Sequence, residues 1–176
     1  TGAYISYYEN GHIKKEGNYK YVIDKPAWQV HEPKDGVWKS YYENGQLKSE
    51  ITYKVVSYQD IRHSYGEEDG PFKYYWENGK LSEEGTYKDG ELDGICLIYY
   101  NTGELETVGM FKDGEKDGIV KGYHKNGQLR LEGIYKNGKR NGPYKWYFDN
   151  GELQSEENWK DGKLLDRSSQ SNQSPL

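Results

Sequence analysis

The chain has 176 residues, of which 33% are hydrophobic and 30% charged, with a net charge of -5. Aromatic residues make up 15%, including 19 tyrosines, which is more than a disordered chain carries, so we expect a folded protein. No apolar run is long enough for a transmembrane helix. The single cysteine, Cys96, excludes an intrachain disulfide framework. The net negative charge argues against nucleic acid as the main partner.

A short turn sequence, Asn-Gly in five places and Thr-Gly once, recurs along the chain and defines a repeat. Its glycines, separated by 34, 34, 24, 24 and 24 residues, are Gly11, Gly45, Gly79, Gly103, Gly127 and Gly151. The spacing predicts six units near 3–36, 37–70, 71–94, 95–118, 119–142 and 143–163. The first two units carry ten extra residues each.

Each unit is predicted to be a β-hairpin, because Asn-Gly between two alternating segments favours a two-residue turn of type I′. In the third unit such a turn places Lys73 opposite Glu84 and Trp76 opposite Leu81. Opposite charges at facing positions stabilise a strand pair, so their recurrence supports this register. The equivalent pairs are Lys39/Glu50, Lys121/Glu132 and Lys145/Glu156.

Strand alternation then assigns the two faces of each hairpin. One face is predicted to be buried, and it contains Phe72, Tyr74, Trp76, Leu81, Gly85 and Tyr87 with their equivalents. Gly85 lies opposite Phe72 there, and a ring can cover such bare backbone. The other face carries the Lys–Glu pairs and one tyrosine in every unit, the Tyr column, which consists of Tyr7, Tyr41, Tyr75, Tyr99, Tyr123 and Tyr147.

The core Tyr-Tyr-x-Asn-Gly-x-Leu and the close Glu-Gly-x-Tyr-Lys-x-Gly-x-x-x-Gly resemble MORN repeats of the bacterial variant form, over about residues 3–162. The resemblance implies an all-β fold, an elongated single-layer antiparallel array of six stacked β-hairpins used as an interaction module. Some members of the family are implicated in binding phospholipids or in self-association. Related bacterial proteins are labelled antitoxins of the YwqK type.

Two features depart from the repeat. The insertions at about 21–32 and 55–66 are interpreted as longer connecting hairpins, Tyr21–Ile23 against Trp28–Val30 and Lys54–Tyr58 against Ile61–His63. They could form a lip for a partner or be a local extension of the sheet. Residues 164–176 lose the period and are interpreted as a polar C-terminal tail.

Catalytic and metal-binding patterns are weak. The carboxylates occupy turns or face lysines, and no Ser–His–Asp or metal-ligand spacing recurs, so we expect no enzyme, no metal and no cofactor. The segments 89–94 and 113–118 imitate half of an EF-hand loop, but the twelfth position would be Tyr100 or His124, so we interpret both as turns.

The fifth unit differs from its neighbours in two ways. It carries an excess of positive charge that could bind an anionic lipid or an acidic partner, from Lys121, Lys125, Arg130, Lys136, Lys139 and Arg140. It also has Gly122 and His124 where the third unit has Tyr74 and Trp76, which could leave a ligand notch in the aromatic face or a site where another segment packs.

The sequence predicts a non-enzymatic protein-interaction or scaffold module that uses its aromatic-rich surface, above all the Tyr column, since tyrosine suits recognition. The alternatives are an antitoxin that neutralises a toxin by direct binding and a peripheral binder of anionic lipid surfaces. Open edge strands would also permit self-association. The chain begins without an initiator Met or a signal peptide, and the compartment stays open.

Overall fold

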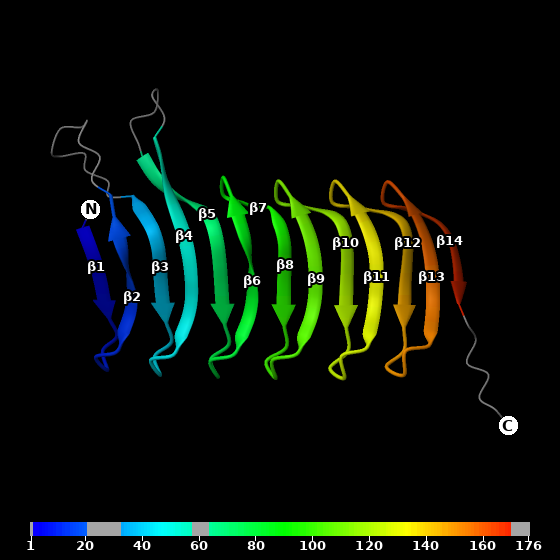
Figure 1. Ribbon diagram of the computed structural model, residues 1–176, viewed down its shortest axis with the longest axis horizontal. Coiled ribbons are helices and arrows are strands. Elements are labelled where there is room, and N and C mark those ends of the chain that lie inside the picture. The colour runs from blue at the N-terminus through cyan, green and yellow to red at the C-terminus, as the bar shows by residue number, and fades with distance from the viewer. Residues whose placement is uncertain (1, 21–32, 58–63, 170–176) are drawn as a thin grey trace. The chain divides into compact units, whose positions relative to one another are not determined.

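The computed structural model describes residues 2–20, 33–57 and 64–169, and these residues form regular structure of β-strands without helices (Figure 1). The chain divides into two compact units, Thr1–Glu91 and Leu92–Leu176. The strands of the first unit are β1 (Gly2–Tyr7), β2 (Ile13–Tyr19), β3 (Lys34–Tyr41), β4 (Leu47–Ser57), β5 (Ser64–Tyr75) and β6 (Leu81–Lys88). Those of the second unit are β8 (Gly94–Tyr99), β9 (Leu105–Lys112), β10 (Glu115–Tyr123), β11 (Leu129–Lys136), β12 (Lys139–Tyr147), β13 (Leu153–Lys160) and β14 (Lys163–Ser169). The two-residue β7 (Glu91–Leu92) lies at the boundary.

Within each unit, strands that are consecutive in the chain pair antiparallel and form a single layer. The six predicted hairpins are confirmed, three in each unit. They are β1–β2, β3–β4 and β5–β6 in the first unit, and β8–β9, β10–β11 and β12–β13 in the second.

The turn inside each hairpin is not the predicted two-residue turn. In the third repeat Gly79 N–H donates to Trp76 O at 2.8 Å, and Trp76 N–H donates to Lys80 O at 2.8 Å. This is a three-residue loop in which Gly79 alone has a positive φ, of 80°, while Asn78 does not. Asn78 is needed for a different reason, because its Oδ1 accepts the Lys80 N–H at 3.0 Å.

The register of the hairpins is therefore confirmed away from the turn and wrong beside it. Lys73 lies opposite Glu84 as predicted, but the residue opposite Leu81 is Tyr75 instead of Trp76. The three-residue loop moves the pairing by one residue, and a β-bulge between Tyr74 and Tyr75 restores it. Because facing residues share a face, Leu81 and the Leu or Ile at the same position of the other repeats lie beside the Tyr column and not on the predicted buried face.

Two-residue turns with two positive φ angles occur at the opposite end of the sheet, in the connections between repeats. Their central residues are Asp89–Gly90, Asp113–Gly114, Asn137–Gly138 and Asp161–Gly162. In the second unit, the glycine N–H of each such turn donates to the preceding connection, as from Gly138 to Lys116 O at 2.9 Å. The segments that imitate half an EF-hand loop begin with these turns.

The second insertion extends β4 and β5 into a longer hairpin, but with partners other than those predicted. Lys54–Ser57 pair with Ser64–Glu67 instead of Ile61–His63, because the strands continue the register that the Tyr53–Glu68 pair sets. The predicted partners Ile61–His63, and the whole of the first insertion hairpin at 21–32, lie outside the described residues.

The buried column contains one buried side chain from most repeats, Trp38 and Phe72 in the first unit and Cys96, Val120 and Tyr144 in the second. The glycines next to it leave room for these side chains. A Cβ at Gly17 would lie 2.3 Å from the Trp38 ring, and one at Gly133 would lie 2.1 Å from the Tyr144 ring. The covering ring comes from the following repeat, so each of these rings packs one repeat on its neighbour.

The C-terminal strand corrects the predicted start of the tail, because β14 continues to Ser169 and pairs with β13. Glu157 fastens it. This carboxylate occupies the glycine column of the last repeat, is 2% exposed, and accepts hydrogen bonds from Arg167 Nε at 2.8 Å and Trp159 Nε1 at 2.9 Å. Arg140 lies 3.4 Å away, between the rings of Tyr144 and Trp159.

We expect Gly17→Ala and Gly133→Ala each to lower the free energy of unfolding by roughly 1–3 kcal/mol, because the new methyl group would collide with the ring of the next repeat. Urea denaturation measures the free energy of unfolding of each variant. Gly11→Asn is the control, since nothing lies within 4 Å of a Cβ there and asparagine tolerates the positive φ of 86°. An alanine variant as stable as the wild type would contradict the packing role of the rings.

We expect Glu157→Gln to destabilise the protein by roughly 1–3 kcal/mol, because Arg140 and Arg167 lose the charge of the buried carboxylate that they bind. Burial acts to raise the pKa of Glu157, but hydrogen bonds from Arg167 and Trp159, with the charges of both arginines, outweigh it and lower the pKa. The stabilisation is therefore present at neutral pH and lost as the pH falls below the unfolded pKa and through the lowered folded one.

Urea denaturation at neutral and acid pH measures the loss for Glu157→Gln. The control is Glu156→Gln on the same strand, whose exposed pair with Lys145 should contribute at most about 1 kcal/mol. Equal losses in the two variants, or no convergence of wild type and Glu157→Gln at low pH, would contradict the role of Glu157.

Candidate interaction surface

One face of each unit carries three parallel rows of side chains that are offset by two residues along the strands. The first is the Tyr column with the Leu or Ile opposite it. The second is the row of Lys–Glu pairs, and the third lies beyond them toward the connecting turns. We call this the Lys–Glu face.

The hydroxyl groups of three members of the Tyr column bind the preceding repeat. Tyr41 Oη donates to Glu16 at 2.6 Å and Tyr147 Oη donates to Glu132 at 2.9 Å. Tyr75 makes the same contact at 3.4 Å to Glu50. These tyrosines are partly buried, so their hydroxyls are committed to contacts between repeats.

The carbonyl groups of the Tyr column are also used. Tyr41 O accepts the Tyr8 hydroxyl at 2.7 Å, and Tyr147 O accepts Nε2–H of His124 at 3.0 Å. The equivalent donors to Tyr75 O and Tyr123 O are hydroxyls of Tyr42 and Tyr100. The column thus connects one repeat to the next.

Two members of the Tyr column differ from the rest. Tyr7 belongs to the first repeat and is 59% exposed. Tyr123 follows a repeat that carries Val108 in place of the glutamate, so it has no carboxylate at that position. These are the members with the most freedom to meet a partner.

The Lys–Glu pairs predicted from the register are present in the structure. Their N–O distances are 3.2 Å for Lys39–Glu50, 3.6 Å for Lys73–Glu84, and 3.9 Å for both Lys121–Glu132 and Lys145–Glu156. Exposed pairs of this kind contribute little to stability, at most about 1 kcal/mol each. The row leaves partly exposed charged groups available for contact.

The third row is apolar in the second unit, and it was not among the surfaces predicted from the sequence. Ile95 and Met110 face each other across β8 and β9, as Ile119 and Ile134 do across β10 and β11. They are 57%, 41%, 50% and 41% exposed, in that order. We call these four side chains, with the exposed Pro143 on β12, the aliphatic row. The strand alternation contained the signal, because each residue lies two positions from a Lys–Glu pair or, in the fourth repeat, from Leu97 and Val108, which take the place of that pair.

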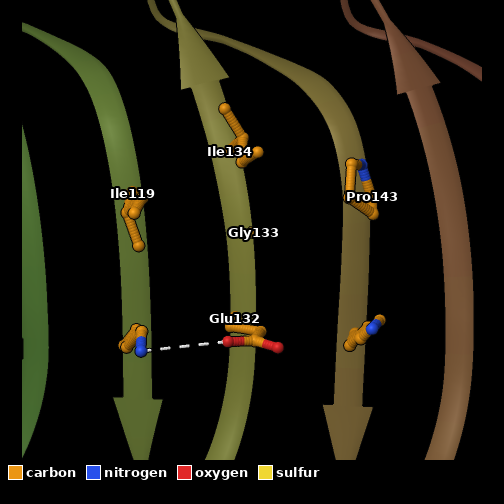
Figure 2. Close-up of a pocket in the computed structure, with 7 residues that line it drawn as sticks. Ile119, Glu132, Gly133, Ile134 and Pro143 are labelled. Carbon is orange, nitrogen blue, oxygen red and sulfur yellow. Dashed lines mark ion pairs between the residues drawn. The ribbon is translucent and has the colours of Figure 1, made fainter.

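A hollow of about 250 Å³ lies where the aliphatic row meets the Lys–Glu row (Figure 2). Its floor is the strand β11 at Gly133. Ile119, Ile134 and Pro143 line one end, and Lys121, Glu132 and Lys145 line the other. A smaller hollow of about 170 Å³ in the first unit is lined at equivalent positions by Val37, Glu50, Thr52, Pro71 and Lys73, and also by Phe72.

The basic residues of the fifth repeat do not form one patch. Lys121 pairs with Glu132, and Arg140 binds Glu157. Lys136 and Lys139 flank one end of the hairpin sheet at the turn Asn137–Gly138, whereas Lys125 lies at the other end, near the Tyr100 ring. The turn at Asn137 also has an acidic neighbour, because its N–H donates to Asp117 at 3.3 Å.

The predicted notch at Gly122 is lined by side chains of the same repeat. Gly122 is buried, and a Cβ there would lie 3.0 Å from Leu131 Cγ and 3.1 Å from Arg130 Nη2. His124 is held by Tyr147 O. Arg130 and Leu131 thus occupy the space that the missing ring leaves.

The described ranges contain no group of three or more His, Cys, Asp or Glu side chains placed to hold a metal ion. In the same ranges, no helix has the length and apolar character to span a bilayer.

Comparison with known protein families agrees with this geometry. The family model of the MORN repeat variant matches six segments, at residues 1–21, 34–54, 68–89, 92–113, 116–137 and 140–161. The chain belongs to the MORN repeat family. Each match contains one hairpin with its Asn-Gly or Thr-Gly loop, and the two insertions fall between matches. MORN repeats are generally protein or lipid interaction modules. No curated protein matches the chain.

Tyr41 and Tyr147 of the Tyr column have raised pKa values. Burial, followed by the hydrogen bond to Glu16, raises the pKa of Tyr41 to about 12, and burial with Glu132 raises that of Tyr147 to about 12. A raised tyrosine pKa stabilises the fold below the ordinary value near 10, and this stabilisation is lost as the pH rises from about 10 to 12. We expect Glu132→Gln to lower the pKa of Tyr147, measured by NMR of the tyrosine rings.

Glu106→Gln provides the control for this titration, because it removes a carboxylate that has no contact with Tyr147. A Tyr147 pKa that stays the same in Glu132→Gln, or that falls equally in both variants, would show that the hydrogen bond does not operate.

Proposed function

We propose that this chain is a non-enzymatic protein-interaction module, and that its partner contacts the Lys–Glu face of the second unit. The observation that carries the proposal is the aliphatic row. Four large apolar side chains that are 41–57% exposed lie in adjacent strand pairs, whereas singly scattered apolar residues are normal on a surface. A contiguous group of this kind, bordered by charged residues, is typical of an interface.

The position of the aliphatic row supports a protein partner. It lies beside Lys–Glu pairs whose charges alternate in sign, which suits a partner with polar and apolar groups on one surface. The Tyr column of the second unit borders the same face, and its less committed member Tyr123 would extend the contact. A toxin neutralised by direct binding would be one partner of this class.

Anionic lipid is favoured less by the geometry. Lipid binding requires several basic groups directed at one surface, but those of the fifth repeat are divided between ion pairs and the two ends of the hairpins. The two lysines that stay exposed together, Lys136 and Lys139, lie at a turn next to Asp117.

A photo-reactive amino acid placed at Ile119 should crosslink the chain to another protein in cells that make it. The same amino acid at Ile98 is the matched control, because Ile98 is an exposed isoleucine of the same unit on the opposite face. Equal crosslinking at both positions, or none at Ile119, would contradict the proposed surface.

Sedimentation with vesicles of phosphatidylserine and phosphatidylcholine separates the lipid alternative. We expect no binding beyond that to phosphatidylcholine alone. Binding that Lys136→Glu with Lys139→Glu abolishes would replace the proposal with the lipid function.

A further inference from the structure

We infer that the hollow over Gly133 binds an apolar side chain of an extended protein segment, together with an aspartate or glutamate beside it in that segment. This inference rests on the proposed function and names the chemistry of the partner. The hollow lies between β10, β11 and β12, and Figure 2 shows its lining side chains on these three strands.

The size of the hollow favours a side chain over a whole ligand. Sites for drug-sized molecules have volumes of about 300–1,000 Å³ and enclose most of the ligand. This hollow has about 250 Å³ and is open along one face of the sheet. A side chain projecting from an extended backbone fits such a shallow site, because the rest of the segment can lie across the strands.

The walls at the upper end of the hollow require an apolar group. Ile119 and Ile134 face each other and are about half exposed, and Pro143 closes the third side. None of the three brings a polar side-chain atom into this end. A branched or aromatic side chain placed here would remove all three from water.

The lower end of the hollow has room for one more carboxylate. Lys121 on β10 and Lys145 on β12 both lie opposite Glu132 on β11, so two ammonium groups and one carboxylate line this end, while Glu156 on β13 lies outside the lining. Each ammonium group has three donors, but its carboxylate partner is 3.9 Å away, Glu132 for Lys121 and Glu156 for Lys145. Glu132 is shared further, because it also accepts the Tyr147 hydroxyl at 2.9 Å. An additional carboxylate would shorten the contacts that both lysines make.

The first unit contains the same site with a less apolar wall. Val37, Thr52 and Pro71 stand where the second unit has Ile119, Ile134 and Pro143, and its hollow has about 170 Å³. The charged end is retained, since Glu50 pairs with Lys39 at 3.2 Å and Lys73 lines the hollow. The exchange of threonine for isoleucine is one of the differences between the two sites, and it provides a substitution that the fold already accepts.

The test is a titration of the full chain with the blocked dipeptide N-acetyl-leucyl-aspartic acid amide at millimolar concentration, followed by NMR of isoleucine methyl groups. We expect saturable shifts at Ile119 and Ile134 and none at Ile98. N-acetyl-leucyl-lysine amide has the same apolar group with the opposite charge and should bind roughly tenfold more weakly. Equal affinity for the two dipeptides, or no saturable shift at Ile119, would overturn the inference.

Two variants separate the halves of the site. Ile134→Thr reproduces the wall of the first unit and should weaken the aspartate dipeptide roughly tenfold. Lys121→Gln with Lys145→Gln should make the affinities for the two dipeptides equal while the leucine contact remains. Unchanged binding in either variant would contradict the role of that half.

Comparison with the crosslinking experiment shows which idea fails. If crosslinks at residue 119 form but neither dipeptide binds, the interaction surface stands and the acidic apolar ligand is wrong. If the aspartate dipeptide binds selectively but residue 119 forms no crosslink, the hollow is confirmed as a site and the proposed partner surface is wrong.

Discussion

The first and the fifth repeat each depend on a ring supplied by the repeat that follows. A single layer of strands has no second layer to cover it, so its buried area must come from contacts along the sheet. Trp38 over Gly17 and Tyr144 over Gly133 supply that contact, because the missing side chain lets the ring approach the backbone. The low aliphatic content of the chain follows from this arrangement, since a layer of this kind has little interior to fill.

Hydrogen bonds at the two ends of the hairpins complete the connection between repeats. At the loop end, the side-chain amide of Asn10 donates to Glu43 O at 2.9 Å, and that of Asn126 donates to Asp149 O at 2.7 Å. At the connecting end, the glycine N–H of one turn donates to the preceding connection. The asparagine therefore has two functions, because its oxygen shapes its own loop while its nitrogen binds the neighbouring loop.

The repeat period, the hairpins and most of the register could be predicted from sequence, because charge pairs such as Lys73–Glu84 lie far enough from the loop to be unaffected by its shape. The loop itself could not be predicted in this way. Asn-Gly occurs in both kinds of loop in this chain, at Asn137–Gly138 in a two-residue turn and at Asn78–Gly79 in a three-residue loop, so the dipeptide alone does not set the loop length. The error moved Leu81 to the wrong face and left Trp76, which is 39% exposed, in the predicted core.

The candidate surface was predictable only in part. The Tyr column was recognised because it is invariant within the chain, but that invariance reflects hydroxyl contacts such as Tyr41 to Glu16 as much as recognition. Ile119 and Ile134 vary among the repeats, so a search for recurring residues passed over them. Glu157 stands where most other repeats have glycine, and its cage of arginines depends on Arg167, in a segment that lacks the repeat pattern.

Both insertions lie between repeats, at the connecting end of the hairpins. At the opposite end of the first unit, the loop of the first repeat is hydrogen-bonded to the loop of the second, and that of the second to the loop of the third. Extra residues can therefore enter at one margin while the other keeps a fixed pitch of about 9.5 Å, the width of two strands. Because the loops along that margin are evenly spaced, a partner whose own repeats had the same spacing would contact each loop in the same way. The opposite margin is then free to diversify, so a chain of this design can change its appendages without altering its spacing.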